Sequence, residues 1–363
     1  MRIVIVGAGP AGGTAALMLA RQRRHEVVLL DRDEFPRVKT CGSGLSPLCI
    51  GLCRELGLHE TMARHAYGVC GLRFTGPAGH MATLAGPEGA WVVPRATFDA
   101  EIAGAAERAG ARFEQGFKVS RLLLDAAGRV RGVAAGDREL EADLTLCADG
   151  AHSRFSVDPR PKRTIATIMG WYEGVPVTPG HMEMWFARRV SPWYGWLFPE
   201  TPTRVNIGLC YHPDDPAKPR DIFDELVTRH VGERLRGATR LGRLRGAPIS
   251  YTDSVGPVTR RGALYLGEAA RLTNGFTGEG IFYAMKSGVM AADLVAKHGG
   301  RTFGGTTLER EYQRAVERAF NLRFRVALAF RGFRGSEAFT ALTALLAFKP
   351  VERVLHWALL HAT

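Results

Sequence analysis

The stretch Arg2-Ile-Val-Ile-Val-Gly7-Ala-Gly9-Pro-Ala-Gly12-Gly13 opens the chain and decides its fold. The apolar, β-branched run before Gly7 is typical of a buried parallel strand. The glycines then predict a tight turn into a helix over 14–21, and residues 26–31 predict a second strand. Strand, glycine turn, helix and strand together indicate the βαβ unit of a dinucleotide-binding fold.

Each glycine of this turn has a physical role in holding a pyrophosphate. Gly7 allows the tight turn, Gly9 lets the backbone approach the phosphates, and Gly12 lets the helix pack closely on the sheet. The helix N-terminus adds free N–H groups and the positive end of its dipole. Asp31, about 20 residues further on, can accept the hydroxyl groups of an adenosine ribose. An acid there disfavours a 2′-phosphate, so the sequence predicts FAD or NAD rather than NADP.

A second segment predicts that the chain returns to the same dinucleotide. The apolar run 142–148 reads as a strand that ends in Asp149-Gly150, with Ser153 and Arg154 close behind. An ordinary Asp-Gly turn is the alternative interpretation. The combination with the first glycine turn favours a cofactor contact at Asp149 and Gly150.

A third return follows the apolar run 263–266. It reads Gly267-Glu268-Ala-Ala and continues to Gly278-Glu-Gly280, where a helix over 278–292 is expected to begin. The N-terminal N–H groups of that helix would face a flavin edge on which negative charge develops during reduction. Three returns to one long dinucleotide favour FAD as the cofactor.

The second and third segments resemble the fingerprints of flavin hydroxylases and their relatives, the p-hydroxybenzoate hydroxylase-like (PHBH-like) superfamily. The resemblance implies that the Asp149-Gly150 turn lies under the FAD pyrophosphate and that the acid at 268 binds the ribityl chain. The superfamily has Asp at that position, and Glu268 is one methylene longer, so the geometry of its contact changes.

Two further segments narrow the family. One is a Cys- and Gly-rich loop, Phe35-Pro-Arg37-Val-Lys39-Thr-Cys41-Gly42-Ser-Gly44. The other is Tyr194-Gly-Trp196-Leu-Phe198-Pro199, followed after eight residues by Gly208-Leu-Cys210. Both resemble the geranylgeranyl reductase family, FAD-dependent enzymes that reduce isolated C=C bonds of isoprenoid chains. The resemblance covers residues 1–300, and it departs from the family at Cys210, where members have Gly, and at Gly275, where they usually have Pro.

The resemblance implies a chemistry for these segments. Reducing an unactivated alkene needs a hydride from flavin N5 and a proton for the other carbon. The family places Cys41 beside the isoalloxazine, where its thiol would supply or relay that proton; the alternative is a small loop residue among glycines. Tyr194, Trp196 and Phe198 alternate along a predicted strand, so they share one face, either of an apolar channel or of a packed core. The residues expected in catalysis are Cys41, Gly42, Tyr194 and Trp196.

The predicted cofactor site draws on all these segments. Arg95, at the start of a helix expected to reach Gly110, would approach the flavin phosphates or ribityl chain. The residues expected to bind FAD are Gly7, Gly9, Ala11, Gly12, Asp31, Arg32, Lys39, Cys41, Arg95, Asp149, Gly150, Gly267, Glu268, Gly278, Gly280 and Ile281. There is no second glycine fingerprint for NAD(P)H, so the reductant is expected to be transiently bound NAD(P)H or a reduced, ferredoxin-like electron-donor protein.

Three other function classes share these motifs. A flavin-dependent monooxygenase, a hydroxylase or epoxidase of secondary metabolism, would use the same three FAD segments. A flavin-dependent halogenase would show Trp-x-Trp-x-Ile-Pro, whereas Trp193 and Trp196 are three residues apart here. A flavin-binding module without turnover is the third class. The Cys41 loop and the Tyr194–Pro199 segment favour the reductase over all three.

The expected fold class is α/β: a Rossmann-like FAD-binding domain, an inserted antiparallel β-sheet substrate domain and a C-terminal helical tail. The chain has 363 residues, more than one core usually holds. We expect a discontinuous FAD-binding domain over 1–60, 95–160 and 258–300, and a substrate-binding cap over 61–94 and 161–257. Residues 301–363 are expected to form C-terminal helices.

Composition limits the location and partners of the protein. The net charge is +12, but the arginines are scattered and no basic stretch is interleaved with aromatic residues, so no nucleic-acid partner is expected. We expect no signal peptide, because a strand begins at Arg2, and no membrane-spanning helix, because no run of about 18 uncharged apolar residues exists. The six cysteines lack paired metal spacing, which predicts no metal site and buried thiols in a reducing cytoplasm.

The tail from Thr306 onward predicts helices with a basic, amphipathic character. Arginines are spread among apolar residues over 309–331, residues 338–348 are nearly uncharged, and 355–360 are apolar again. Such a tail can lie on an anionic membrane, which would suit a lipid-like small-molecule substrate. It can equally pack on the FAD domain or on a partner subunit.

Overall fold

Strand β1 (Arg2–Val6) lies at the centre of a six-stranded sheet, with four of its five residues buried. The β-branched run predicted this burial, since a central parallel strand is covered on both faces. The strands follow in the order β16 (Thr259–Arg260), β17 (Ala263–Tyr265), β10 (Leu144–Cys147), β1, β2 (Glu26–Leu30) and β6 (Arg112–Glu114). Every neighbouring pair is parallel except β16 and β17.

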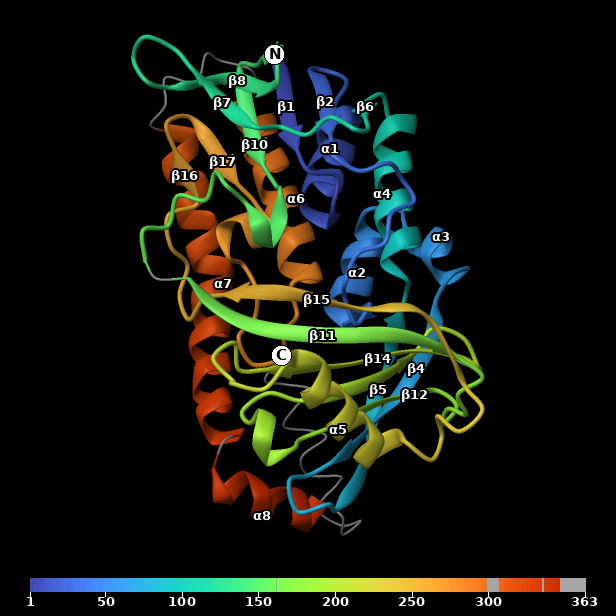
Figure 1. Cartoon of the computed structure of the whole chain (residues 1–363). Helices are drawn as coiled ribbons and strands as arrows, with labels where there is room; N and C mark the ends of the chain where they lie inside the picture. Colours follow the sequence, from blue (N-terminus) through green and yellow to red (C-terminus); the bar gives the residue numbers. More distant parts are fainter. Residues whose placement is uncertain (161, 299–306, 335, 347–363) are drawn as a thin grey trace. The chain divides into compact units, whose positions relative to one another are not determined.

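Two layers cover this sheet. Helices α1 (Pro10–Arg21), α4 (Arg95–Arg108) and α6 (Ile281–His298) pack together on one face (Figure 1). A three-stranded sheet of β7 (Arg121–Leu124), β8 (Val130–Ala135) and β9 (Arg138–Glu141) covers the other. There Val4 and Val6 join Val28, Leu30 and Val133 in one buried cluster. The arrangement is the Rossmann-like layer structure that the βαβ signal predicted.

The first part of α7 (Thr307–Arg334) belongs to the same unit. Tyr283 of α6 lies between Phe320 and Phe324, with ring centroids 5.1 Å from each. The hydroxyl of Tyr312 donates a 3.1 Å hydrogen bond to the carbonyl of Tyr265. Short 3₁₀ turns follow β10 and β17 at Gly150–His152 and Gly267–Ala270.

A second, eight-stranded sheet forms the core of the other unit. Its order is β15 (Thr239–Tyr251), β11 (Arg163–Glu173), β14 (Arg204–Tyr211), β13 (Gly195–Pro199), β12 (His181–Trp185), β4 (Tyr67–Thr75), β5 (Met81–Val92) and β3 (Gly44–Leu45). The pairs from β11 to β12 and from β4 to β3 are antiparallel, as expected. β12 and β4 are parallel, so the sheet is mixed at this point.

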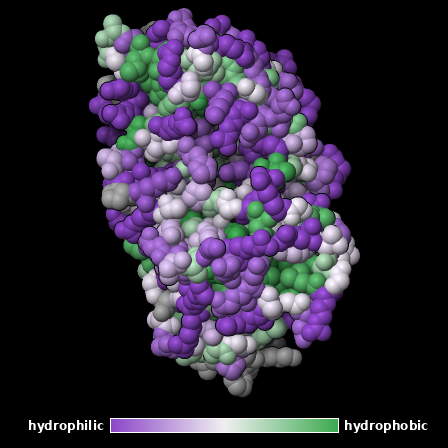
Figure 2. All heavy atoms as spheres, in the orientation of Figure 1, coloured by the Kyte–Doolittle hydropathy of each residue, from purple (hydrophilic) through white to green (hydrophobic). Residues whose placement is uncertain are grey.

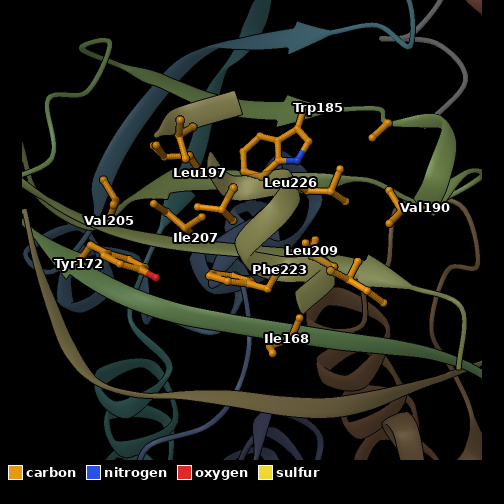
Figure 3. Close-up of a cluster of buried hydrophobic side chains, with 14 of the residues drawn as sticks. Ile168, Tyr172, Trp185, Val190, Leu197, Val205, Ile207, Leu209, Phe223 and Leu226 are labelled. Atoms are coloured by element: carbon orange, nitrogen blue, oxygen red, sulfur yellow. The ribbon is translucent and has the colours of Figure 1, made fainter. Parts of the chain in front are cut away.

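Helix α5 (Pro219–Val231) packs on one face of this sheet. Figure 3 shows Phe223 and Leu226 of α5 among the strand residues Ile207, Leu209 and Leu197, all fully buried or nearly so. Truncating a buried aromatic such as Phe223 costs about 3–5 kcal/mol. Because side chains alternate along a strand, the residues between these apolar positions point to the opposite face. The remaining elements of the unit are α2 (Pro47–Glu55), α3 (His59–Ala63), the 3₁₀ turn Arg188–Val190 and α8 (Glu337–Leu346).

The structure, a computed structural model, describes residues 1–160, 162–298, 307–334 and 336–346. Of these described residues, those within 1–39, 95–163 and 250–325 form one compact unit, and those within 40–94, 164–249 and 326–346 form the other. Three of the five boundaries fall inside β11, β15 and α7.

These boundaries differ from the expected ones by a few residues at 162–163 and 250–257, which belong to the first unit rather than to the cap, and by longer segments in two places. Residues 40–60, expected with the FAD-binding domain, fold in the second unit because Gly44 and Leu45 pair with Val92 and Trp91 of β5. Residues 307–325, expected in a separate tail, fold with the first unit through the aromatic contacts of Tyr283. Helices α7 and α8 do follow Thr306, whereas the predicted apolar segment 355–360 lies outside the described residues.

Hydrophilic residues cover most of the face shown in Figure 2, with hydrophobic residues between them. Among the helices that the structure describes, none combines the length and apolar character needed to cross a bilayer.

Candidate active site

The predicted cofactor residues of the first unit gather at the carboxyl ends of its parallel strands. Hydrogen bonds tie these ends together: Gly7 N donates to Leu30 O at 2.7 Å, and Ala148 N donates to Val6 O at 2.8 Å. Leu266 N donates to Cys147 O at 2.9 Å. In open α/β sheets, ligands bind outside this edge, so the three returns of the chain meet where a dinucleotide is expected.

The glycines of the first turn fall into two groups. Gly7 has φ +100°, and a Cβ on it would lie 2.4 Å from Ala148 O. A Cβ on Gly12 would lie 1.9 Å from Gly7 O, so both glycines are demanded by the fold itself. At Gly9 the nearest atom to such a Cβ is Arg37 Nη2, at 3.8 Å. The open space over Gly9 is therefore compatible with a ligand close to the backbone.

Asp31 holds the glycine turn in place. Its carboxylate accepts hydrogen bonds from Ala8 N at 2.8 Å and from Asp33 N at 3.0 Å, and the residue is 7% exposed. A carboxylate has about four acceptor positions, so these two bonds leave capacity for a ribose hydroxyl. The neighbouring Arg32 is largely exposed, and its Nε lies 3.6 Å from Asp33 Oδ2.

Arg37 and Asp99 are site residues to which the sequence assigned no role. Arg37 Nη2 lies 3.0 Å from Asp99 Oδ2, and Arg37 Nε lies 4.0 Å from Asp31 Oδ1. Arg37 Nη1 is buried and has no hydrogen-bond partner within the described chain. A buried guanidinium edge beside Gly9 has the chemistry to receive a phosphate oxygen. The sequence signal that could have identified Arg37 is its position: it is a cation in the loop after the second strand.

Asp99 also fixes Arg95, which was expected near the cofactor. Arg95 Nε donates a 2.8 Å hydrogen bond to Asp99 Oδ1, and Arg95 Nη2 donates one of the same length to Asp99 Oδ2. Both residues are buried, and they lie four positions apart at the start of α4. Arg95 therefore forms a bidentate ion pair with Asp99, a contact that the sequence did not predict.

The Asp149-Gly150 turn follows β10, as predicted. Gly150 has φ +78°, a conformation that favours glycine. Asp149 Oδ1 is buried without a hydrogen-bond partner among the described residues, and burial raises the pKa of this carboxyl. An unpartnered buried oxygen beside the strand edge can accept a hydroxyl or amide donor of a bound ligand.

The third return places Gly267 and Glu268 at the end of β17. Gly267 has φ +57°, and a Cβ there would lie 3.0 Å from the Cβ of Ala11, so the first and third returns touch. Glu268 Oε1 accepts a 2.8 Å hydrogen bond from Ser250 N. Burial raises the pKa of Glu268, while the charge of Lys39 is among the influences that lower it.

The helix that follows the third return begins later than predicted. Helix α6 starts at Ile281 rather than at Gly278, because Gly278 has φ +74° and closes a loop by donating to Asn274 O. Asn274 Oδ1 accepts from Phe276 N and Thr277 N. These bonds show how this chain closes the loop with Asn-Gly where the family usually has Pro. Gly280 and Ile281 then lie at the N-terminus of α6.

In the second unit, a side chain of the sheet holds the backbone of the Cys41 loop. Asn206 of β14 donates from Nδ2 to Cys41 O at 2.8 Å and accepts from Trp196 Nε1 at 2.8 Å. Asn206 is fully buried, and the sequence offered no signal for its role. Ser43 N approaches Cys41 Sγ at 3.4 Å, within the range for a sulfur acceptor.

The predicted aromatic stripe forms on the face opposite α5. Ring centroids lie 6.3 Å apart both for Tyr194 and Trp196 and for Trp196 and Phe198, so the three rings share one face as expected. Gly208 makes room for this stripe, because a Cβ there would lie 2.3 Å from the Trp196 ring. A Cβ on Gly42 would lie 3.2 Å from the Phe198 ring, which places the Cys41 loop against the stripe.

The expectation that the cysteine thiols are buried is only partly correct. Four are buried, namely Cys49, Cys53, Cys147 and Cys210. Cys70 is exposed, because the alternation of β4 turns Val69 inward and Cys70 outward. Cys41 is half-buried. Burial raises the pKa of Cys210 to about 12, so this departure from the family's Gly adds an inert thiol.

Comparisons with known proteins agree with this geometry. The FAD binding domain family matches residues 1–184. Menaquinone reductase of Mycolicibacterium smegmatis is 30% identical over 364 residues, 90% of this chain and 83% of that protein. Digeranylgeranylglycerophospholipid reductase of Methanothrix thermoacetophila is 29% identical over 317 residues, 81% of this chain and 77% of that protein.

Solved structures show the same fold. A geranylgeranyl bacteriochlorophyll reductase-like protein of Thermoplasma acidophilum superposes with a TM-score of 0.83 at 22% identity, covering 95% of this chain and 91% of that one. A flavin-dependent brominase reaches 0.80 at 20% identity, covering 98% and 94%. At these identities the structures establish the PHBH-like flavoprotein fold alone. Together with the sequence relatives and the FAD-binding match, they show that the chain is an FAD-dependent oxidoreductase and belongs to the geranylgeranyl reductase family.

Proposed function

We propose that this enzyme reduces C=C bonds of an isoprenoid or other lipid-like substrate. The observation that carries the proposal is the Cys41–Asn206–Trp196 arrangement, which fixes a thiol-bearing loop against an aromatic stripe. Two relatives are named for the reduction of menaquinone and of a digeranylgeranylglycerophospholipid, which supports an apolar substrate.

The residues of the first unit suit FAD, which when bound and reduced supplies the hydride. We assign the diphosphate to the open backbone at Gly9, the N-terminus of α1 and the buried edge of Arg37. Asp31 would hold the adenosine ribose, and Glu268 the ribityl chain. The N-terminus of α6 would stabilise negative charge on the cofactor ring. Each assignment rests on a donor, an acceptor or a space in this chain.

Cys41 is proposed to give the proton that completes the reduction. One alkene carbon takes the hydride and the other takes the proton from Sγ, so the bond gains two electrons and two hydrogens. The thiolate left on Cys41 would be stabilised by Ser43 N at 3.4 Å and would regain its proton from water. Asn206 acts as a positioning residue, because it holds the backbone of Cys41 without reaching the reacting atoms.

The aromatic stripe is proposed to bind the apolar chain of the substrate. Trp196 is nearly buried and its only polar atom is satisfied by Asn206, so its ring presents an apolar surface. Tyr194 and Phe198 extend that surface on either side. Rings on one face of a strand suit a long hydrocarbon, which gains from contact area rather than from directional bonds.

The proposal extends to the reductant and the location of the enzyme. We propose a cytoplasmic enzyme that receives electrons from NAD(P)H or a reduced carrier protein and touches the membrane peripherally. Exposed Leu328, Phe330 and Phe333 near the end of α7 support membrane contact. If replacing the three by Ser leaves pelleting with anionic phosphatidylglycerol vesicles unchanged, these side chains do not dock the protein.

Mass spectrometry of lipid and small-molecule extracts tests the reaction class. Cells with and without the gene are compared, and purified enzyme is then supplied with the accumulated species and a reductant. Species that lack two hydrogens per step identify a C=C reductase, and their headgroup names the substrate. A difference of one oxygen would replace the reductase with a monooxygenase while leaving the FAD assignment intact.

A further inference from the structure

A groove in the second unit is lined by cations and plays no part in the proposed chemistry. It has a volume of about 520 Å³, within the range of sites for small organic ligands. It lies where the start of α5 meets β11 and β15. Its lining residues are Ile168, Lys218, Pro219, Arg220, Arg240, Arg243 and Leu244.

The charge of this groove is one-sided. Four of its lining residues are cationic, and none of the lining residues in the described chain is acidic. Asp224 Oδ2 lies 3.5 Å from Arg220 Nε, and Arg240 Nε donates a hydrogen bond to Gly242 O. The positive charges of Arg220 and Arg240 are therefore partly balanced by these groups. Like charges on one groove repel each other, and an anion bound among them removes that cost.

A backbone irregularity brings two of the arginines to the same groove. Residues three apart on a regular strand point to opposite faces, which would separate Arg240 from Arg243. Gly242 lies between them with φ +77°, a conformation that interrupts the alternation of β15. Both arginines therefore line the groove, and each has an exposed side chain.

The groove also has an apolar floor. Ile168 belongs to the hydrophobic cluster of Figure 3 and supplies one part of it. Leu244 supplies the other, and Gly170 makes room for it, because a Cβ there would lie 2.9 Å from Leu244 Cδ2. Cations above an apolar floor suit a ligand that carries both phosphate and an apolar or planar part.

We propose that this groove binds a phosphate-bearing organic ligand. Its phosphates would lie among Lys218, Arg220, Arg240 and Arg243, and its apolar part on Ile168 and Leu244. A soluble dinucleotide such as NADPH and the headgroup of an anionic phospholipid share this chemistry. The site goes beyond the proposed function, because it does not depend on which bond the flavin reduces.

The test compares two variants of equal charge in the full-length, FAD-loaded protein. Arg240→Gln/Arg243→Gln removes two groove cations, and Arg121→Gln/Arg138→Gln removes two exposed arginines of β7 and β9. NADPH and inorganic pyrophosphate are titrated by calorimetry, and phosphatidylglycerol vesicles are pelleted with each protein. FAD content and substrate reduction driven by dithionite are measured alongside, and neither is expected to change.

The groove variant is expected to bind one of these probes at least about tenfold more weakly than wild type, while the control stays within about twofold. Loss of NADPH binding identifies a soluble ligand, and loss of vesicle binding alone identifies a lipid headgroup. Leu244→Ser should weaken NADPH but not pyrophosphate in the first case. If both double variants bind every probe as wild type does, the groove is not a phosphate site. The same conclusion follows if both variants lose binding of a probe to the same extent. A failed alkene reduction with intact groove binding would sink the proposed function alone.

Discussion

The side-chain amide of Asn206 donates a 2.8 Å hydrogen bond to the carbonyl oxygen of Cys41. The other atom of the same amide, Oδ1, accepts a 2.8 Å hydrogen bond from Trp196 Nε1. Because a carboxamide carries both a donor and an acceptor, one buried side chain fixes the cysteine loop and the central ring of the aromatic stripe. The two features that carry the proposed function therefore depend on each other.

Replacing Asn206 tests this dependence. Asn206→Asp keeps an acceptor for Trp196 but puts an oxygen opposite Cys41 O, so the loop should lose its anchor. We expect kcat to fall at least about tenfold with KM and FAD content nearly unchanged, and unfolding free energy to fall by roughly 1–3 kcal/mol. Steady-state kinetics, the rate of Cys41 alkylation and urea denaturation measure these changes. A kcat within about twofold of wild type would show that the loop does not need this bond.

Cys41→Ala should retain FAD and lose at least about 100-fold in turnover, the usual contribution of a general acid. Cys70→Ala is the matched control, because Cys70 is an exposed thiol in the same unit. Flavin absorbance reports cofactor content, and reduction of the flavin by dithionite should proceed normally in both variants. Normal substrate reduction by Cys41→Ala would remove the proton-relay role.

Gly9→Val separates cofactor binding from folding. The protein itself leaves space at Gly9, so the added side chain should block only the approach of the cofactor diphosphate. We expect purified Gly9→Val to lack flavin while its apoprotein unfolds at the wild-type urea concentration. Gly12→Ala is the contrast, because its Cβ would meet Gly7 O at 1.9 Å and should destabilise the apoprotein. An FAD-replete Gly9→Val protein would contradict the placement of the diphosphate.

His230 predicts a pH dependence of stability. Burial against Trp185, with ring centroids 5.5 Å apart, lowers the pKa of His230 below its ordinary value of 6.5. Between that lowered pKa and 6.5 the unfolded chain binds more protons, so the free energy of unfolding falls as pH decreases through this window. His25 and His152, whose pKa values burial also lowers, act in the same direction.

His230→Phe keeps the ring stacked on Trp185 and removes the titrating group. The drop in urea midpoint between pH about 7.5 and about 5 should be smaller than in wild type. His80→Phe, at an exposed position, should leave the drop unchanged. An equal drop in wild type and His230→Phe would show that His230 does not contribute.

Much of the first unit was predictable because its signals are local. The run Arg2–Val6, the glycines of the turn and the strand ends at Asp31 and Asp149 carry their meaning within a few residues. The aromatic stripe was also predictable, since period two along β13 places Trp196 and Phe198 on one face. The start of α6 was placed three residues early, because the positive φ of Gly278 depends on a loop closed by Asn274.

By itself, therefore, the sequence determined the Rossmann-like unit and the three segments that meet at the carboxyl ends of its parallel strands. It also determined that the aromatic residues alternate and so share one face of their strand. Tertiary structure alone decided that Arg37 meets Asp99, that β12 pairs in parallel with β4, and that Asn206 joins Cys41 across 165 residues of sequence. The physical reason is that strand burial and turn conformation follow from neighbours in the chain. A hydrogen bond or an ion pair depends on the distance between atoms, which folding sets for residues that no local pattern connects.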